Sequence, residues 1–391
     1  MGKSCHWRIV REIFIMVFSM LLFCPAGQVL SDSLKVVKQE EHMMVFPGKE
    51  WDRRKPGDFG IPQDVIDEIG EKMKLARSNG VLVKNGYLVA EWNYAGAPET
   101  RFNAKSITKS ILGMLFCLAL DDGLVPGPHA RVRELWPDFD AGPYTKDITF
   151  DNLMTATSGV KTIAPYWQHY TRNLSRGRDF RPPGMPGEYY NDHSMYLAGA
   201  LTYLFEKDLL EVLRERILVK IGAEADWMTN GEGAPDGLGD HGKYRSFESD
   251  RPVMPPGYVN LRNGKKARWV TGFSRSCWSA RDLARVGWLI LNEGKWKGEK
   301  VMPGLPVVKY KSVIPETPYM SWKIDENGSW FMTGSGGQFC MIMPKEKIVL
   351  AKVNEWRNAE NTGNKTMVEV NRLHLAPILV KLMGKEDKKP D

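Results

Sequence analysis

Hydrophobic and polar positions follow two different periods between residues 61 and 92. The segment IPQDVIDEIGEKMKLARSNG (61–80) has the spacing of an amphipathic helix, and its composition predicts that this helix ends at Asn79-Gly80. Residues 81–92, VLVKNGYLVAEW, contain two runs of strand-forming residues around Asn85-Gly86, a pair that is typical of a type I′ turn. We therefore expect a helix followed by a β-hairpin.

Residues 106–120 are apolar on nearly every side, which predicts a buried helix. The following region, about 121–325, is richer in proline and glycine and contains shorter helical patterns. Strand patterns return close to the C-terminus, before a last helical pattern. These late segments are SWFMTGSGG (329–337), QFCMIMP (338–344), KIVLAKV (347–353) and the helical TMVEVNRLHLAPILVKL (366–382).

This order of elements predicts an α+β fold. The strands near both ends of the chain would form one antiparallel sheet from the N- and C-terminal segments, flanked by helices. The largely helical region of about 121–325 would be inserted between them. A chain of 391 residues with 42% hydrophobic residues is long enough to bury a large core.

The N-terminus has the layout of a secretory signal. Three basic residues within the first eleven positions precede the apolar run IFIMVFSMLLFC (13–24), and small residues follow. The run is shorter than the ~20 apolar residues that cross a bilayer. We expect residues 1–26 to be a cleaved signal peptide, so that the protein is exported to the periplasm or secreted, without stable membrane insertion afterwards. Residues 27–44 would be a flexible segment and 384–391 a charged tail.

Charge and cysteine usage exclude several other classes of function. The net charge of +7 is scattered, with no basic stripe among aromatic residues, so no nucleic-acid partner is expected. Beyond the signal, three widely spaced cysteines remain, which gives neither a disulfide framework nor a metal-binding pair. The seven histidines include no H-E-x-x-H motif. No metal or other cofactor is therefore expected.

The buried helix begins with a candidate nucleophile and base. Ser106 and Lys109 are three residues apart, so on a helix they share a face with Cβ atoms about 5–6 Å apart. The helix N-terminus brings free N–H groups to the hydroxyl, and burial would lower the pKa of the lysine toward a value suited to proton abstraction. The alternative is an N-terminal serine beside an exposed lysine. The same spacing occurs at Ser158 and Lys161, but a helix that began there could not continue past Pro165.

Two later stretches carry further candidate chemistry. Tyr190-Asn191-Asp192 follows a Pro-Gly turn and precedes a helical pattern. A tyrosine close to a cationic lysine can transfer protons because the charge favours its phenolate, although an aromatic packing role is the alternative. Gly334 and Gly336 follow a strand pattern, where glycines often mark the close approach of a ligand or another backbone, a bulge being the alternative.

The three stretches in this order resemble the serine β-lactamase and penicillin-binding-protein superfamily, whose signature is S-x-x-K, then Y-x-N or S-x-N, then K-T-G. The resemblance covers about residues 45–383, which we expect to form one β-lactamase-like serine hydrolase domain. Within the superfamily the likeness is greatest to class-C-type relatives, namely esterases and 6-aminohexanoate-oligomer hydrolases.

The resemblance implies a role for each matching position. Ser106 would be the acylated nucleophile, Lys109 its general base, and Tyr190 the group that relays a proton to the leaving group. The backbone N–H groups of Ser106 and Ser335 would form the oxyanion hole. Substrate-binding positions would also include Gly334, Gly336 and Asp192.

Two positions depart from the family signature. Aspartate, at 192, replaces the usual asparagine, and Met332 replaces the lysine of the third motif, which in β-lactamases helps to hold the substrate carboxylate. Negative charge at 192 would also repel an anionic substrate. We therefore expect a neutral or cationic small-molecule substrate.

The expected function is an exported serine hydrolase that cleaves an ester or amide through an acyl-serine intermediate, without a cofactor. Two alternatives stay open. One is a D-alanyl carboxypeptidase or β-lactamase, and the other is a non-catalytic cell-envelope protein that keeps the ligand-binding site.

Overall fold

The structure is a computed structural model, and the chain divides into two compact units, Met1–Val45 and Phe46–Asp391. Apart from Val45, all residues whose structure is described belong to the second unit. The described residues are 45–160, 182–184, 192–228, 244–245, 257–304, 322–324, 328–354, 375 and 378.

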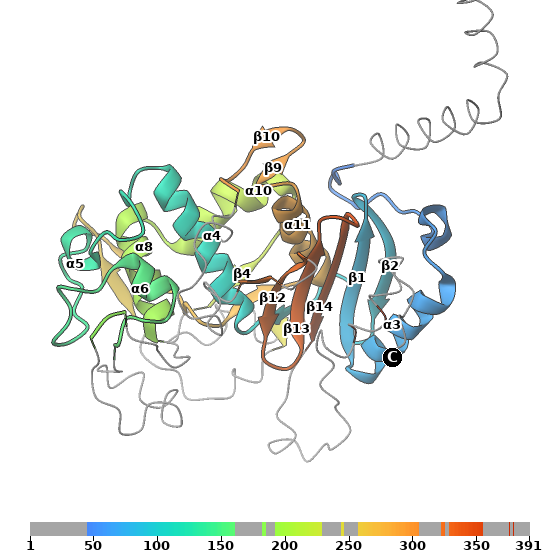
Figure 1. The fold of residues 1–391 in the computed structure, drawn as a ribbon, viewed down its shortest axis with the longest axis horizontal. Helices are drawn as coiled ribbons and strands as arrows, with labels where there is room; N and C mark the ends of the chain where they lie inside the picture. The colour runs from blue at the N-terminus through green and yellow to red at the C-terminus, as the bar shows by residue number, and fades with distance from the viewer. Residues whose placement is uncertain are drawn as a thin grey trace, which may run out of the picture. The chain divides into compact units, whose positions relative to one another are not determined.

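An antiparallel sheet of six strands organises this unit, and it joins the two ends of the described chain (Figure 1). The N-terminal strand β1 pairs with the C-terminal strand β14, with Leu82 opposite Leu350. The expected α+β fold, with one sheet built from both terminal segments, is confirmed. In spatial order the strands are β11 (Trp322–Ile324), β12 (Trp330–Gly334), β13 (Gln338–Met343), β14 (Ile348–Asn354), β1 (Ser78–Lys84) and β2 (Tyr87–Asn93).

The hairpin between β1 and β2 turns where the sequence predicts. Asn85 and Gly86 have φ angles of 52° and 86°, as a type I′ turn requires at both central positions. The preceding helix, α3 (Gln63–Leu75), ends earlier than predicted. Arg77 has a φ of 44° and stops the helix, and the next three residues, 78–80, already pair with β14. Pairing across the sheet therefore overrides the local helical pattern.

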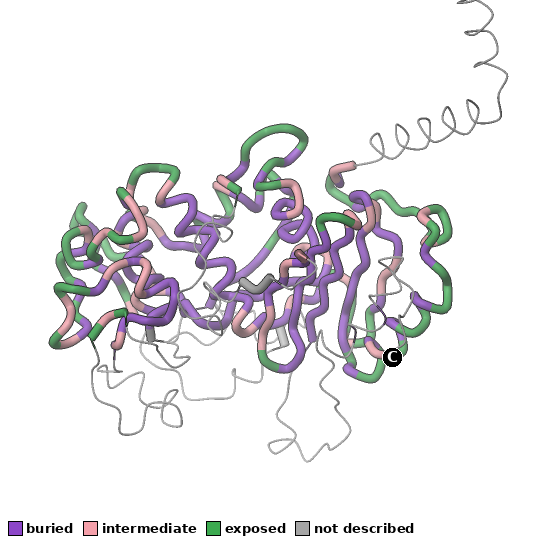
Figure 2. The backbone as a smooth tube through the Cα atoms, viewed as in Figure 1, coloured by how far each residue is buried: buried purple, intermediate pink, exposed green. Residues whose placement is uncertain are grey.

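Helices cover both faces of the sheet. On one face, α3 packs its apolar side, including Ile69 and Met73, against strand residues such as Leu350. On the other face, α11 (Ala280–Leu291) contacts β1, β13 and β14, while α4 (Ile107–Asp121) contacts β12. The tube drawing shows that buried residues run along these central strands (Figure 2).

The region between β2 and β11 contains short helices and small sheets as well as α4 and α11. Among the described residues, its helices include α5 (Val132–Leu135), α6 (Phe150–Met154), α8 (Asp192–Phe205), α9 (Leu209–Leu213) and α10 (Val219–Ile221). One small sheet has the order β4 (Asp226–Trp227), β8 (Ser276–Trp278), β3 (Arg101–Asn103) and β5 (Tyr244–Arg245). Two-stranded sheets are formed by β6 (Tyr258–Asn260) with β7 (Lys266–Arg268), and by β9 (Lys295–Trp296) with β10 (Glu299–Lys300).

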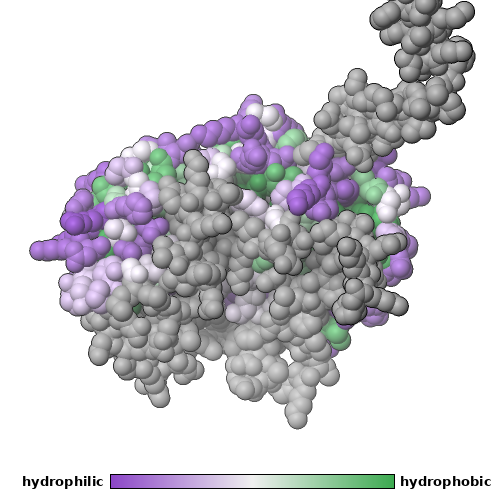
Figure 3. Space-filling view, viewed as in Figure 1, coloured by the Kyte–Doolittle hydropathy of each residue, from purple (hydrophilic) through white to green (hydrophobic). Residues whose placement is uncertain are grey.

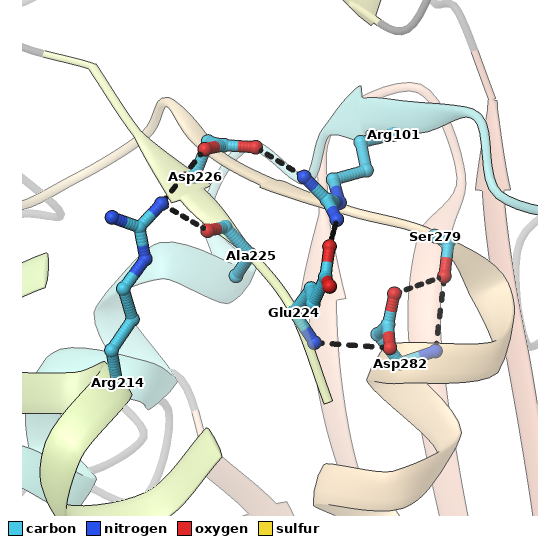
Figure 4. A network of polar contacts seen from close by, with 7 residues as sticks. All are labelled: Arg101, Arg214, Glu224, Ala225, Asp226, Ser279 and Asp282. Atoms are coloured by element: carbon cyan, nitrogen blue, oxygen red, sulfur yellow. Dashed lines mark hydrogen bonds and ion pairs between the residues drawn. The ribbon is translucent and has the colours of Figure 1, made fainter. Parts of the chain in front are cut away.

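A polar network attaches β3 to its surroundings (Figure 4). The Arg101 guanidinium donates to the Asp226 carboxylate at 2.7 Å and also pairs with Glu224. The Glu224 backbone N–H donates to Asp282 on α11 at 3.1 Å, and Asp282 accepts a second bond from Ser279 at 2.6 Å. Because β3 leads directly into α4, this network fixes the approach to the start of that helix.

The exposed large hydrophobic side chains among the described residues are Leu75, Tyr94, Val219 and Tyr258. The face drawn in Figure 3 has hydrophilic residues along its upper and left edge. Within the described part of the chain, none of the helices has both the length and the apolar character that a membrane span needs.

Candidate active site

Ser106 and Lys109 meet at the first turn of α4. Ser106 is the N-cap residue, and its carbonyl accepts a backbone hydrogen bond from Lys109 at 3.0 Å. The Lys109 Nζ donates to the Ser106 Oγ at 3.2 Å. Only 3% of Lys109 is exposed, so it is not a surface charge. The structure thus places a buried amine beside the hydroxyl, as the i, i+3 spacing predicts.

The turn that precedes the serine is held from two sides. Lys105 has a φ of 54°, a left-handed conformation that non-glycine residues adopt only when their surroundings enforce it. The Asn103 Oδ1 accepts the backbone N–H of Lys105 at 2.9 Å and that of Arg275 at 3.0 Å. One buried side chain therefore couples this turn to the segment that leads into β8.

Lys109 has a second acceptor opposite the serine. Its Nζ donates to the carbonyl oxygen of Phe273 at 3.3 Å and lies 5.8 Å from the centroid of that residue's ring. The amine is thus held between a hydroxyl and a backbone carbonyl, next to an aromatic ring. Sequence reasoning missed Phe273, because a backbone carbonyl has no residue-type signal.

The first turn of α8 packs onto the same segment. A Cβ added to Gly272 would lie 1.9 Å from the carbonyl oxygen of Ser194, so only glycine permits this approach. The Gly272 N–H also contacts the Met195 Sδ at 3.1 Å, and the Trp269 indole donates to the Met195 carbonyl at 2.8 Å. Helix α8, whose first residue is Asp192 of the Tyr-Asn-Asp motif, therefore begins beside the segment that carries the Phe273 carbonyl.

His193, in this turn of α8, is a buried neighbour of Lys109. Only 3% of the residue is exposed. Burial, and to a smaller extent the positive charge of Lys109, together lower the pKa of His193 to about 3. The imidazole is therefore neutral at physiological pH.

The glycine-rich third motif lies against the residues just before Ser106. A Cβ on Gly334, at the end of β12, would lie 2.3 Å from the Ala104 carbonyl oxygen and 3.1 Å from the Lys105 Cβ. The exposed Ser335 follows, and then Gly336, whose φ of 79° forms part of the turn into β13. The strand end and the helix start are thus in direct contact.

Met332 is fully buried in β12, with 0% of its surface exposed. It lies between Trp322 and Cys340 in the strand register. The position that carries a lysine in the third motif of β-lactamases is therefore occupied by a side chain packed into the protein interior.

The remaining predicted positions are only partly described. Asp192 is the first residue of α8, but its side chain, like Tyr190, lies outside the described residues. In the second S-x-x-K copy, the Ser158 hydroxyl is buried without a hydrogen-bond partner, and Lys161 is also outside the description. In the described parts of the chain, no cluster of three or more histidine, cysteine or acidic residues is placed to hold a metal ion.

A sequence model of the Beta-lactamase family matches residues 74–366. The chain belongs to this family. The match covers all the predicted site residues, from Ser106 to Gly336. The expected membership is therefore confirmed. No curated protein matches the chain significantly.

Solved structures share the fold at low sequence identity. A Bacillus anthracis protein provisionally assigned as a 6-aminohexanoate-dimer hydrolase has a TM-score of 0.57 and 18% identity, covering 88% of this chain and 87% of its own. The octameric penicillin-binding protein homologue from Pyrococcus abyssi gives 0.57 and 15%, with 84% and 78% covered. EstCE1, a hydrolase with promiscuous acyltransferase activity, gives 0.51 and 14%, with 75% and 93% covered. These similarities concern the fold alone.

Proposed function

We propose that this β-lactamase-family protein is a serine hydrolase that cleaves an ester or amide through an acyl-serine intermediate. The observation that carries the proposal is the buried Lys109 amine 3.2 Å from the Ser106 hydroxyl. A nucleophile and a base within hydrogen-bond reach, with the base held in turn by a third group, form the usual arrangement of covalent catalysis. Here the third group is the Phe273 carbonyl.

Acylation begins when Lys109, in its deprotonated form, takes the Ser106 hydroxyl proton and Oγ attacks the substrate carbonyl carbon. The carbonyl oxygen becomes an oxyanion, and the proposed donors to it are the backbone N–H groups of Ser106 and Ser335. Preorganised donors of this kind are worth several kcal/mol in the transition state. The C–O or C–N bond then breaks, and the leaving group receives the proton through Tyr190.

Hydrolysis of the acyl-serine completes the cycle. A water molecule gives its proton to the Tyr190–Lys109 pair and attacks the acyl carbonyl carbon. The ester bond to Ser106 then breaks, its Oγ regains a proton, and the carboxylic acid leaves. No step needs a metal or an organic cofactor, because all the proton transfers use side chains of the chain itself.

The proposed substrate is a neutral or cationic small molecule. Met332 is apolar and buried, so it offers no ammonium to pair with a substrate carboxylate. Asp192 begins the helix that packs beside Phe273, and a carboxylate there disfavours anions. We also propose that the protein acts outside the cytoplasm, on the basis of the signal-like N-terminus. N-terminal sequencing of the protein recovered from its native host tests that location.

A fluorophosphonate probe tests the nucleophile directly. Wild-type protein should be labelled, and Ser106→Ala should not be. Ser158→Ala is the matched control, because it removes the buried hydroxyl of the second S-x-x-K copy and should leave labelling intact. Labelling that survives Ser106→Ala would refute the assignment. Tyr190→Phe should slow acylation by a nitrophenyl ester by about 10²–10⁴-fold, as expected for a lost acid–base group.

A penicillin-directed activity is the second candidate, supported by the shared fold with the Pyrococcus penicillin-binding protein homologue. Fluorescent penicillin distinguishes the two. Stable labelling at Ser106 would favour the penicillin-binding candidate, whereas turnover of nitrophenyl esters without penicillin labelling would favour the esterase or amidase. A wild-type protein that is inert to both reagents would support a non-catalytic binding protein.

A further inference from the structure

Lys352 is a second buried lysine, on the opposite face of the sheet from α4. Among the described residues only Lys109 and Lys352 are buried lysines, and 0% of Lys352 is exposed. In β14 it lies two residues from Leu350, so both side chains share the face covered by α3. Burying an ammonium group is costly unless it is hydrogen-bonded. Its partners therefore indicate what it does.

The Lys352 ammonium binds the turn that follows the third motif. Its Nζ donates to the Gly337 carbonyl oxygen at 3.0 Å and to the Asn354 Oδ1 at 2.9 Å. Gly337 ends the turn between β12 and β13, which begins at Ser335. Gly336 and Gly337 have φ angles of 79° and 77°, so this backbone uses conformations open mainly to glycine. A charge-assisted hydrogen bond thus fixes a segment with little conformational restraint of its own.

Gln338 fastens the same turn from the other face of the sheet. It precedes Phe339, which lies opposite Lys352 in the register, so alternation directs Gln338 away from the α3 side. Its side chain donates to the Asn354 carbonyl at 2.7 Å and accepts the Asn354 N–H at 2.9 Å. Gln338 pairs with Gly334, the residue pressed against Ala104. We call the hydrogen bonds of Lys352 and Gln338 to Gly337 and Asn354 the clamp. Through Gln338 and Gly334, the clamp is connected to the start of α4.

We propose that Lys352 is a positioning residue for acyl transfer: by holding the Gly337 carbonyl it orients the 335–337 turn, so that the Ser335 N–H faces the substrate oxyanion. This inference rests on the proposed function. The donor position matters because an oxyanion hole acts through preorganised geometry, and loss of one donor typically costs about 10²–10³-fold in kcat. A donor that is misplaced rather than lost should cost less.

The test compares Lys352→Met with a stability control. Methionine keeps an unbranched chain of similar length and removes the ammonium. In folded protein, we expect the acylation rate with a nitrophenyl ester to fall by about 10–100-fold, with KM changed far less, because the affected interaction forms in the transition state. Leu82→Ala, in the same apolar face, should lower the urea midpoint with little effect on acylation. Lys352→Arg, which keeps a charged donor, should restore part of the rate.

Amide hydrogen exchange gives a readout independent of catalysis. Lys352→Met should raise exchange at residues 335–337 selectively, and Leu82→Ala should not. If Lys352→Met does not fold, Gln338→Met tests the clamp from the other face, with the same expected changes. Wild-type acylation and unchanged exchange in a folded variant would overturn the inference. A wild-type protein without Ser106-dependent labelling would refute the proposed function instead, and exchange at the turn would then decide the role of Lys352.

Discussion

Gly334 approaches Ala104 so closely that a Cβ on the glycine would lie 2.3 Å from the Ala104 carbonyl oxygen. The contact joins the last residue of β12 to the segment just before Ser106. Two motifs far apart in the sequence are thus in van der Waals contact. This close approach is possible because glycine has no side chain.

Gly334→Ala should therefore separate the strand end from the start of α4. The methyl group meets a backbone oxygen that cannot rotate away, so the strand or the helix start must shift. Because small displacements of catalytic groups cost about 10²-fold, we expect Ser106 acylation to fall by at least that order. Rates of fluorophosphonate labelling measure it. Gly127→Ala, where a Cβ meets nothing within 4 Å, is the control and should behave as wild type.

Lys109→Met should abolish the proton acceptor while preserving an unbranched side chain. We expect acylation to slow by about 10²–10⁴-fold, measured by stopped-flow release of nitrophenol. Lys109→Arg should not rescue it, because a guanidinium stays protonated at any working pH. Lys74→Met, on exposed surface of α3, controls for loss of charge. An acylation rate equal to wild type in folded Lys109→Met would contradict the base assignment.

The three cysteines among the described residues should be inert in the folded protein. Cys117, Cys277 and Cys340 are all buried, and burial raises the pKa of Cys117 to about 12 and that of Cys340 further still. Since the thiolate is the reactive form, iodoacetamide at pH 8 should modify these positions only after unfolding in urea. Peptide mapping by mass spectrometry reads out each site. Rapid alkylation of Cys117 without denaturant would show that α4 opens locally.

Local features of the fold, and the joining of the terminal strands in one sheet, were predictable from the sequence, whereas element boundaries and single contacts set by distant residues were not. Asn85-Gly86 specifies its turn through the φ angles of two adjacent residues. The predicted end of α3 was wrong because residues 78–80 pair instead with residues 352–354 of β14, more than 270 positions away. No property of the segment itself reveals that partner.

The same distinction applies to the candidate site. The pairing of Ser106 with Lys109 follows from helical spacing, and the burial of the lysine follows from its apolar neighbours. The Phe273 carbonyl and the Lys352 clamp were not predictable, because each depends on which loop the fold brings alongside. Lys352 is the one charged residue in β14, and its role is not evident until the turn that it binds is known.

His193 should make stability depend on pH. Its pKa in the folded protein, about 3, is below its ordinary value of 6.5, because burial disfavours the charged imidazole and Lys109 repels it. Between these two values the unfolded chain binds a proton that the folded chain does not. The free energy of unfolding should therefore decrease as the pH falls from 6.5 toward 3, by at most about 1.4 kcal/mol per pH unit for this group. Above about pH 7.5, where the unfolded imidazole is also neutral, the contribution is constant.

Urea unfolding of wild type and His193→Gln at pH 7.5, 6.5 and 5 isolates this contribution, since other titrating groups are shared and cancel in the difference. Wild type should lose about 2 kcal/mol more than the variant between pH 6.5 and 5. Glutamine cannot be protonated in this range, so position 193 in the variant contributes no pH dependence to the free energy of unfolding. Equal pH slopes for the two proteins would mean that the imidazole reaches water in the folded protein, contrary to its burial in the first turn of α8.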